Sequence, residues 1–170
     1  MAPFLWKIYV LNLGPSLPVP VYRQLFADDI KIYIGIGDGS ESALLQDAVD
    51  QVESWSFEKR MSLSKKKRLV IKSQPCSTVY GIQGSALPVH DDALDLGVWM
   101  SPHLKFHHHV TAVVAPASKS CNMILRTFIV KRASFYLHMY RTIVLPKLLY
   151  CCTVWSPYLQ RDIKLLEAVA

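Results

Sequence analysis

The sequence contains none of the short motifs that mark the commonest nucleotide-binding and hydrolytic sites. It has no Walker loop, no dinucleotide-binding glycine fingerprint and no serine–histidine–aspartate spacing. It also has no internal repeat and no low-complexity tract. These absences argue against a nucleotide-dependent enzyme of the common types, a triad hydrolase and a repeat protein.

Cysteine is scarce, with four residues in a chain of 170, and no pair has the spacing of a zinc ribbon. Cys151 and Cys152 are adjacent, which is an awkward geometry for binding one metal ion together. We therefore expect reduced, buried thiols in an intracellular protein.

Long apolar runs are missing as well. Met1–Val10 is apolar, but Lys7 interrupts it and no small-residue cleavage site follows, so we expect no signal peptide. Thr142–Trp155 is broken by Pro146 and Lys147 and is too short to span a bilayer. The sequence therefore predicts an intracellular protein, nuclear or cytoplasmic, that is neither secreted nor embedded in a membrane.

The composition is that of a globular chain with a modest positive charge. Apolar residues make up 51%, which is enough for a core, and the length suits one domain with at most a small appendage. Lysine and arginine number 19 against 13 acidic residues, so the formal net charge is +6. This excess is compatible with a nucleic-acid partner but does not establish one.

Two adjacent carboxylates, Asp28 and Asp29, lie between short apolar runs at Val21–Phe26 and Ile30–Ile34. The β-branched and aromatic content of both runs predicts a strand, a tight turn and a second strand. Neighbouring side chains in a strand face opposite sides, so both carboxylates can serve one site only where the backbone turns sharply. Their repulsion at a hairpin tip favours a compensating divalent cation, and the plain alternative is a solvated turn.

A helix is expected after this hairpin, from about Ser40 to Arg60, with Asp38 as its cap and Glu41 in capping-box spacing. Trp55 lies in an apolar stripe of helical spacing, so we expect it in the core. The stripe also holds Leu44, Leu45, Ala48, Val49 and Val52. Three short strands are then predicted, at Ser77–Ile82, Ala86–Val89 and Asp95–Met100.

Beyond Pro102 the pattern becomes helical. Helices are expected at His107–Phe128, with Pro116 as a kink or interruption, at Phe135–Leu145 and at Arg161–Val169, with Leu148–Trp155 as a buried segment. The first carries the apolar face Val110, Val113, Val114, Ala117, Cys121, Ile124 and Leu125, and the third carries Ile163, Leu166 and Ala170. The sequence thus predicts an α+β fold with a soft domain boundary near residue 100, which separates residues 1–100 from residues 101–170.

The string Leu25–Tyr33, with Phe26-Ala27-Asp28-Asp29 at its centre, resembles motif C in the palm domain of reverse transcriptases of non-LTR (LINE-type) retrotransposons. Trp55–Arg68 resembles motif D of the same family, with Lys67 at its lysine and Ser64 where an asparagine is usual. Further pattern matches cover nearly the whole chain. They are Pro3–Leu13 (the end of motif B and its helix), Tyr80–Leu87 and Asp95–Val98 (the hairpin that grips the primer end), and Tyr140–Pro146, Tyr150–Pro157 and Lys164–Glu167 (the thumb).

The resemblance implies a partial palm over residues 1–100, a thumb-like helical region over 101–170, and an RNA template and DNA primer as partners. Asp28 would ligate two Mg²⁺ ions with support from Asp29, and Lys67 would neutralise the leaving pyrophosphate. The family's motif A aspartate and its fingers are not among the 170 residues, so we expect weak magnesium binding and no polymerase activity from this chain alone. A non-catalytic nucleic-acid-binding module and a pseudogene relic are the alternatives.

Three other clusters of polar residues leave two interpretations each. Lys65, Lys66 and Arg68 fit a solvated turn or a nuclear-localisation signal. His103 and His107 have the i,i+4 spacing of metal ligands, but no Cys, Asp or Glu lies close in sequence, so we expect an exposed helix start at His103–His109. The third cluster combines aromatic and basic residues, namely Phe135, Tyr136, Tyr140, Lys131, Arg132 and Arg141. It fits either a surface that binds a duplex or core aromatics with exposed cations.

Overall fold

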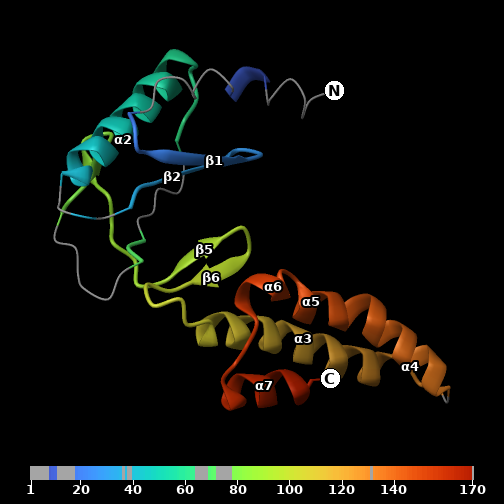
Figure 1. Ribbon diagram of the computed structural model, residues 1–170. Helices are drawn as coiled ribbons and strands as arrows, with labels where there is room; N and C mark the ends of the chain where they lie inside the picture. The colour runs from blue at the N-terminus through green and yellow to red at the C-terminus, as the bar shows by residue number, and fades with distance from the viewer. Residues whose placement is uncertain are drawn as a thin grey trace. The chain divides into compact units, whose positions relative to one another are not determined.

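The structure is a computed structural model. It describes residues 8–10, 18–35, 37, 40–63, 69–71, 78–130 and 132–169. The chain divides into two compact units, Met1–Arg68 with Cys76–Val89 and Leu69–Pro75 with His90–Ala170. Helices and two-stranded antiparallel sheets make up both units, which confirms the predicted mixture of α and β structure (Figure 1). The predicted boundary near residue 100 stays a prediction.

The first unit contains the predicted hairpin. Strand β1, Tyr22–Phe26, pairs antiparallel with β2, Asp29–Tyr33, with Phe26 opposite Asp29 at the closed end. Ile30 and Ile32 alternate with polar residues along β2 and pack into a core built on helix α2. The alternation read from the sequence therefore fixes which face of the hairpin is buried.

Helix α2, Glu41–Glu58, supplies the other half of that core. Ala48, Val52 and Trp55 are buried, which confirms the predicted stripe and the core position of Trp55. Asp38, the predicted cap, lies outside the described residues. The burial follows from spacing alone, because positions three and four apart share one face of a helix.

A second hairpin follows, with strands β3, Gly81–Ile82, and β4, Ser85–Ala86, that are shorter than the sequence predicted. The Gln46 side chain of α2 holds it through both amide atoms. The Gly81 N–H donates to Gln46 Oε1 at 2.9 Å, and Gln46 Nε2 donates to the Gly81 carbonyl at 2.9 Å. The amide thus replaces the ladder partners that a longer strand would have had.

The second unit begins with a hairpin where the sequence predicted one strand over Asp95–Met100, and that prediction is wrong. Strands β5, Ala93–Asp95, and β6, Val98–Met100, are joined by Leu96 and Gly97, whose φ angles are 46° and 86°. Positive φ at both central residues is the geometry of tight hairpin turns. A Cβ at Gly97 would lie 3.1 Å from the Tyr150 ring, so glycine is needed for space as well as for conformation.

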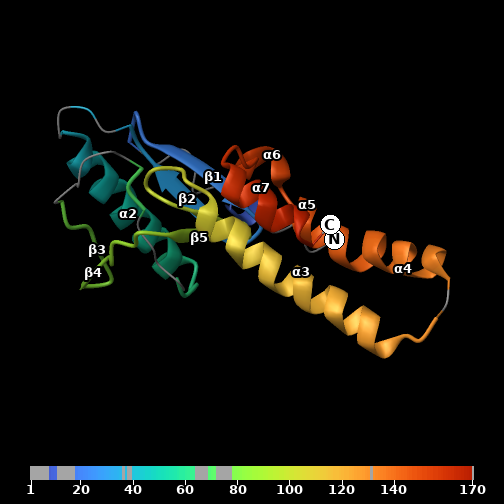
Figure 2. The same ribbon diagram turned by 90° about the horizontal axis from the view of Figure 1, so that it is seen from below.

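In the part of this unit that the structure describes, six helical segments follow the hairpin. They are α3 His107–Thr127, α4 Ala133–Met139, the π-helical turn η1 Tyr140–Val144, α5 Leu145–Leu149, α6 Cys152–Trp155 and α7 Gln160–Glu167. Helix α3 packs along α4, η1 and α5 and also against α7, and Figures 1 and 2 show α3 and the α4–α5 run side by side. Ala117, Ile124, Val144 and Leu148 form the core between them.

Helix α3 continues through Pro116, so the kink or interruption predicted at this proline does not end the helix. Pro116 is exposed, and its carbonyl accepts a hydrogen bond from Ser120 Oγ at 3.0 Å. The second predicted helix is longer than Phe135–Leu145, because α4, η1 and α5 follow one another without a gap. Pro146 lies in the first turn of α5. Backbone nitrogens in a first turn have no hydrogen-bond partner within the helix, so the N–H that proline lacks is not missed there.

Two burial predictions for this unit are wrong, and a third is confirmed in part. Leu125 is 64% exposed, because it lies one position, about 100° of helix rotation, from the buried Ile124. Leu148–Trp155 is buried only at its two ends, since the helix breaks at Cys151, whose φ is 51°. In α7, Leu166 packs against the apolar clusters as predicted, but the residue with the least exposure is Asp162, and Ala170 lies outside the described residues.

Candidate functional site

The two predicted catalytic carboxylates lie at the closed end of the β1–β2 hairpin. Ala27 and Asp28 form the two-residue connection, and Asp29 is the first residue of β2. Ala27 has a φ of 52°, a conformation that costs a residue with a Cβ about 1 kcal/mol or more. Both aspartates are exposed. The sharp turn that the carboxylate pair requires is therefore present, at some cost in backbone strain.

One face of the hairpin carries aromatic and polar side chains. Tyr22 and Tyr33 stack with their ring centroids 5.5 Å apart, and both are largely exposed. Lys31 and Asp29 alternate with the inward isoleucines of β2, so they share the face of Tyr33. Asp29 thus lies on the surface opposite the core and on the same face as Lys31, while the stacked tyrosines lie at the other, open end of the hairpin.

The donor chemistry at the hairpin tip suits magnesium, which prefers carboxylate oxygens and keeps several waters. Over the described ranges, no group of three His, Cys, Asp or Glu side chains could hold a metal ion. Asp28 and Asp29 thus supply two carboxylates, and Lys67, the third predicted site residue, lies outside the described residues. The structure places two of the three predicted residues together and leaves the third untested.

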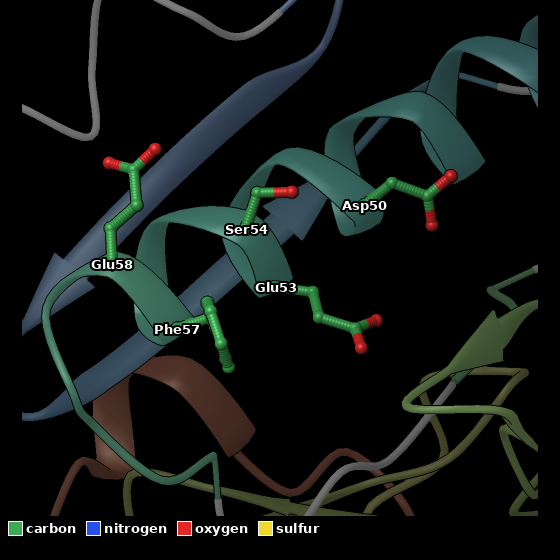
Figure 3. A pocket seen from close by; sticks show the side chains of 5 residues that line it. All are labelled: Asp50, Glu53, Ser54, Phe57 and Glu58. Atoms are coloured by element: carbon green, nitrogen blue, oxygen red, sulfur yellow. The ribbon is translucent and has the colours of Figure 1, made fainter.

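A shallow hollow of about 410 Å³ lies on the outward side of α2 (Figure 3). Its lining comes from α2 alone and consists of Asp50, Glu53, Ser54, Phe57 and Glu58. Phe57 is 84% exposed, and neither hairpin aspartate contributes to the lining. This lining includes three carboxylates that do not form a group able to hold a metal ion, so the hollow serves as the acidic comparison site for cation binding at the hairpin tip.

The helices of the second unit are strongly basic. The sequence has no Asp or Glu between Asp95 and Asp162, whereas it has eight lysines and arginines. These eight are Lys105, Lys119, Arg126, Lys131, Arg132, Arg141, Lys147 and Arg161. All but Lys131, which lies outside the described residues, are exposed. We call the α3–α5 part of this unit, residues 107–149, the basic arm. The long gap between acidic residues in the sequence was the signal that could have predicted it.

The far end of the basic arm is held by aromatic side chains. The Tyr136 hydroxyl donates to the Phe128 carbonyl at 2.5 Å and accepts from the Val130 N–H at 3.4 Å. Phe135 packs edge-on against Phe128 and Tyr136. The aromatic residues here are half-buried and structural, while Arg132 and Arg141 stay exposed, so the cations rather than the rings are available to a ligand.

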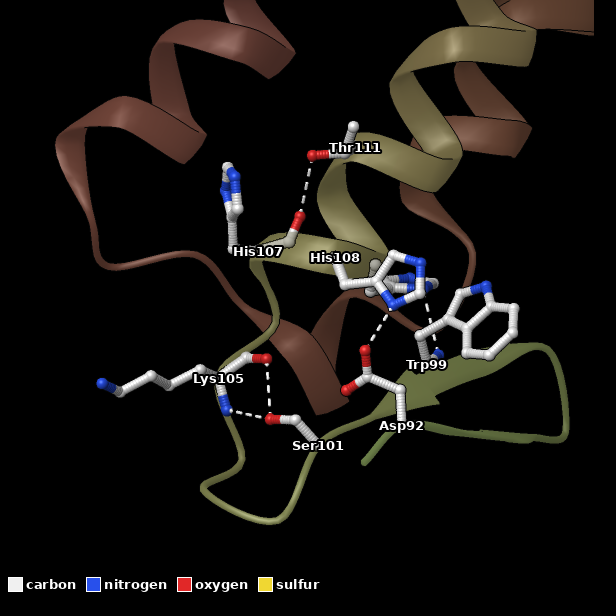
Figure 4. Close-up of polar contacts among 8 residues, drawn as sticks. Asp92, Trp99, Ser101, Lys105, His107, His108 and Thr111 are labelled. Atoms are coloured by element: carbon white, nitrogen blue, oxygen red, sulfur yellow. Dashed lines mark hydrogen bonds and ion pairs between the residues drawn. The ribbon is translucent and has the colours of Figure 1, made fainter. Parts of the chain in front are cut away.

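Of the histidines predicted as an exposed helix start, His103 and His108 are exposed, whereas His109 is only 1% exposed. His107 and His108 each contact a carboxylate that is distant in sequence. Figure 4 shows the contact between His108 and Asp92. His107 Nδ1 lies 2.5 Å from Asp162 Oδ1, and His108 Nδ1 lies 2.7 Å from Asp92 Oδ2. Sequence reasoning missed these partners because they are 55 and 16 residues away.

Comparison with known proteins adds little to this geometry. No protein-family model matches the chain, and no solved structure matches it. A 73-residue stretch is 37% identical to uncharacterized protein B0403.1 of Caenorhabditis elegans, and it makes up 43% of this chain and 37% of that protein. The chain thus spans little more than a third of that relative's length, and the similarity assigns neither a family nor an activity.

None of the helices in the described ranges combines the length and the apolar character that a membrane crossing requires.

Proposed function

We propose that this chain is the palm-and-thumb portion of a reverse transcriptase of the non-LTR type, and that its basic arm holds an RNA–DNA duplex. The observation that supports this most is the β1–β2 hairpin, which carries Asp28 and Asp29 at its closed end and packs its other face on α2. That is the local geometry a motif C carboxylate pair needs, because the turn brings adjacent side chains to one end of the hairpin.

The two units are proposed to have different roles, metal binding in the first and duplex binding in the second. Asp28 would hold magnesium, with Asp29 in support, and the bound ions would activate the primer hydroxyl and position the triphosphate. The 170 residues supply one carboxylate set, whereas two-metal nucleotidyl transfer needs carboxylates from two places. On its own, therefore, the chain is proposed to bind primer and template without extending the primer.

Duplex binding is assigned to the basic arm on electrostatic grounds. Exposed cations without neighbouring carboxylates attract phosphates and release the counterions condensed on a nucleic acid. The arm meets this condition, because it has no acidic residue and its described lysines and arginines are all exposed. A non-catalytic nucleic-acid-binding module would use the same surface, so the arm supports both forms of the proposal.

Binding to an RNA–DNA hybrid is expected to weaken steeply with salt. Six or more phosphate contacts lower affinity about 10³-fold or more between about 50 mM and about 200 mM salt. Fluorescence anisotropy with a labelled hybrid, repeated across this range, measures the slope. An affinity that is flat with salt, or no binding at low salt, would contradict the proposal and would favour a relic without function.

A further inference from the structure

Three consecutive histidines in the first turn of α3 each hold a different part of the second unit. His107 contacts Asp162 of α7. His108 contacts Asp92, just before β5, and its ring stacks on the ring of Trp99 of β6 with the ring centroids 4.7 Å apart (Figure 4). His109 also reaches β6, through its ring nitrogen. The start of α3 is therefore the point where α7 and the β5–β6 hairpin are fastened together.

His109 makes a contact of a different kind from its two neighbours. Its Nδ1 accepts a hydrogen bond from the Trp99 backbone N–H at 3.3 Å, and its ring packs edge-on against Trp155 at 4.9 Å. Its Nε2 is buried without a hydrogen-bond partner among the described residues. An imidazole that accepts at Nδ1 must be neutral, with its proton on Nε2, because a protonated ring has two donors and no acceptor.

Protonation has opposite consequences for these histidines. An imidazolium at position 107 or 108 keeps its hydrogen bond to the facing carboxylate, because the charged ring still donates. An imidazolium at position 109 would turn an N–H toward the Trp99 N–H and would carry a charge in the apolar cluster of Val98, Val110 and Trp155. Acid therefore breaks one of the three contacts and leaves the other two in place.

We propose that the His109–Trp99 contact is an acid-released latch, which holds strand β6 to the first turn of α3 when His109 is neutral and lets it go when His109 is protonated. The hairpin stays near α3 through the His108–Asp92 pair and the stacking of His108 on Trp99, so the release is a local loosening of the β6 backbone at Trp99. Independently of the proposed function, this makes the second unit responsive to pH at one defined point.

The groups around the latch support this assignment. Burial, with a smaller contribution from the neighbouring His108, lowers the pKa of His109 from 6.5. Asp92 faces His108 from the segment before β5, Asp162 faces His107 from α7 with Arg161 Nε 3.5 Å away, and Cys152 of α6 packs in the same cluster as Trp155. The two carboxylates that bond to this turn, Asp162 and Asp92, contact His107 and His108 and not the His109 ring.

The direction of the pH effect follows from the lowered pKa. A histidine whose folded-state pKa lies below its unfolded value costs no stability above the unfolded pKa, because it is neutral in both states there. At lower pH it destabilises the folded state, because the unfolded chain binds the proton more readily. The stability that the neutral ring provides is therefore complete above about pH 6.5 and is lost as the pH falls from there toward the folded-state pKa. We therefore expect β6 to loosen over this acidic range, below about pH 6.5.

The test is hydrogen exchange of the Trp99 amide, followed by NMR on the full chain between about pH 7.5 and about pH 5, a range that spans ordinary histidine titration. Protection factors, corrected for the intrinsic pH dependence of exchange, are expected to fall several-fold at Trp99. Amides inside α3, such as that of Ile124, are expected to keep their protection. Equal loss at both sites would show global unfolding and would overturn the proposal, as would unchanged protection at Trp99.

Two variants separate His109 from its neighbour. In His109→Gln the Trp99 protection is expected to lose its pH dependence, and in His108→Gln the transition is expected to remain. Should His109→Gln fail to fold, the ring ¹⁵N shifts of His109 in the native chain give a second readout. They are expected to show protonation in the same pH range as the loss of Trp99 protection, and titration at a different pH would overturn the proposal.

Discussion

Trp155→Ala is expected to lower the free energy of unfolding of the second unit by about 3–5 kcal/mol, the loss typical of truncating a large buried aromatic side chain. Trp155 is 2% exposed and packs with Val98 and Val110. Its Nε1 also donates to the Tyr150 carbonyl at 2.7 Å, so truncation removes a hydrogen bond and leaves a cavity. Such a loss is a large fraction of the about 5–15 kcal/mol that stabilises a typical domain.

Urea denaturation followed by far-ultraviolet circular dichroism measures this loss without relying on tryptophan fluorescence. The matched control is Val154→Ala, because Val154 is adjacent in sequence but 55% exposed. The control is expected to stay within about 0.5 kcal/mol of the native chain. A loss below about 1 kcal/mol for Trp155→Ala would contradict the packing of α6 against β6 and α3.

Neutralising three exposed cations of the basic arm is expected to weaken hybrid binding about a hundredfold or more at low salt. The triple variant Lys119→Gln, Arg126→Gln and Arg141→Gln removes charges that have no carboxylate neighbour in the arm. Each lost phosphate contact lowers the slope of log affinity against log salt by about one. Both the affinity and the slope are read from the same anisotropy titrations.

The control variant removes the same net charge elsewhere. Lys59→Gln, Arg60→Gln and Lys164→Gln lower the charge by three outside the basic arm. If binding depended only on net charge, the two triple variants would weaken it equally. We expect the control to lose much less affinity than the arm variant, and equal losses would remove the arm as the binding surface.

The hairpin and α2 could be predicted from the sequence because their signals are local. The alternation of Ile30 and Ile32 and the helical spacing of Ala48, Val52 and Trp55 specify buried faces without knowledge of the rest of the chain. The turn at Leu96 and Gly97 was missed, because leucine at positive φ gives no warning in a run of strand-forming residues. Local patterns thus predicted the strands of the first hairpin and α2, but not the turn formed by Leu96 and Gly97 at positive φ.

The histidine contacts could not be predicted, because they depend on segments brought together by folding. The sequence shows three histidines without a nearby acidic residue, whereas the structure supplies Asp162 and Asp92 from 55 and 16 residues away. The basic arm is the opposite case, since its lack of carboxylates is plain in the sequence once acidic residues are located along the chain. Charge distribution carried more information about function here than net charge did.

The claim that Asp28 and Asp29 form a divalent-cation site is tested most directly by manganese broadening of NMR signals in the presence of an RNA–DNA hybrid. Paramagnetic Mn²⁺ takes the same oxygen ligands as Mg²⁺ and reports even weak binding at nearby amides. We expect the signals of residues 27–30 to broaden first, and to be spared in Asp28→Asn combined with Asp29→Asn. Broadening that begins at Asp50, Glu53 and Glu58 of α2, with the hairpin tip unaffected, would contradict it.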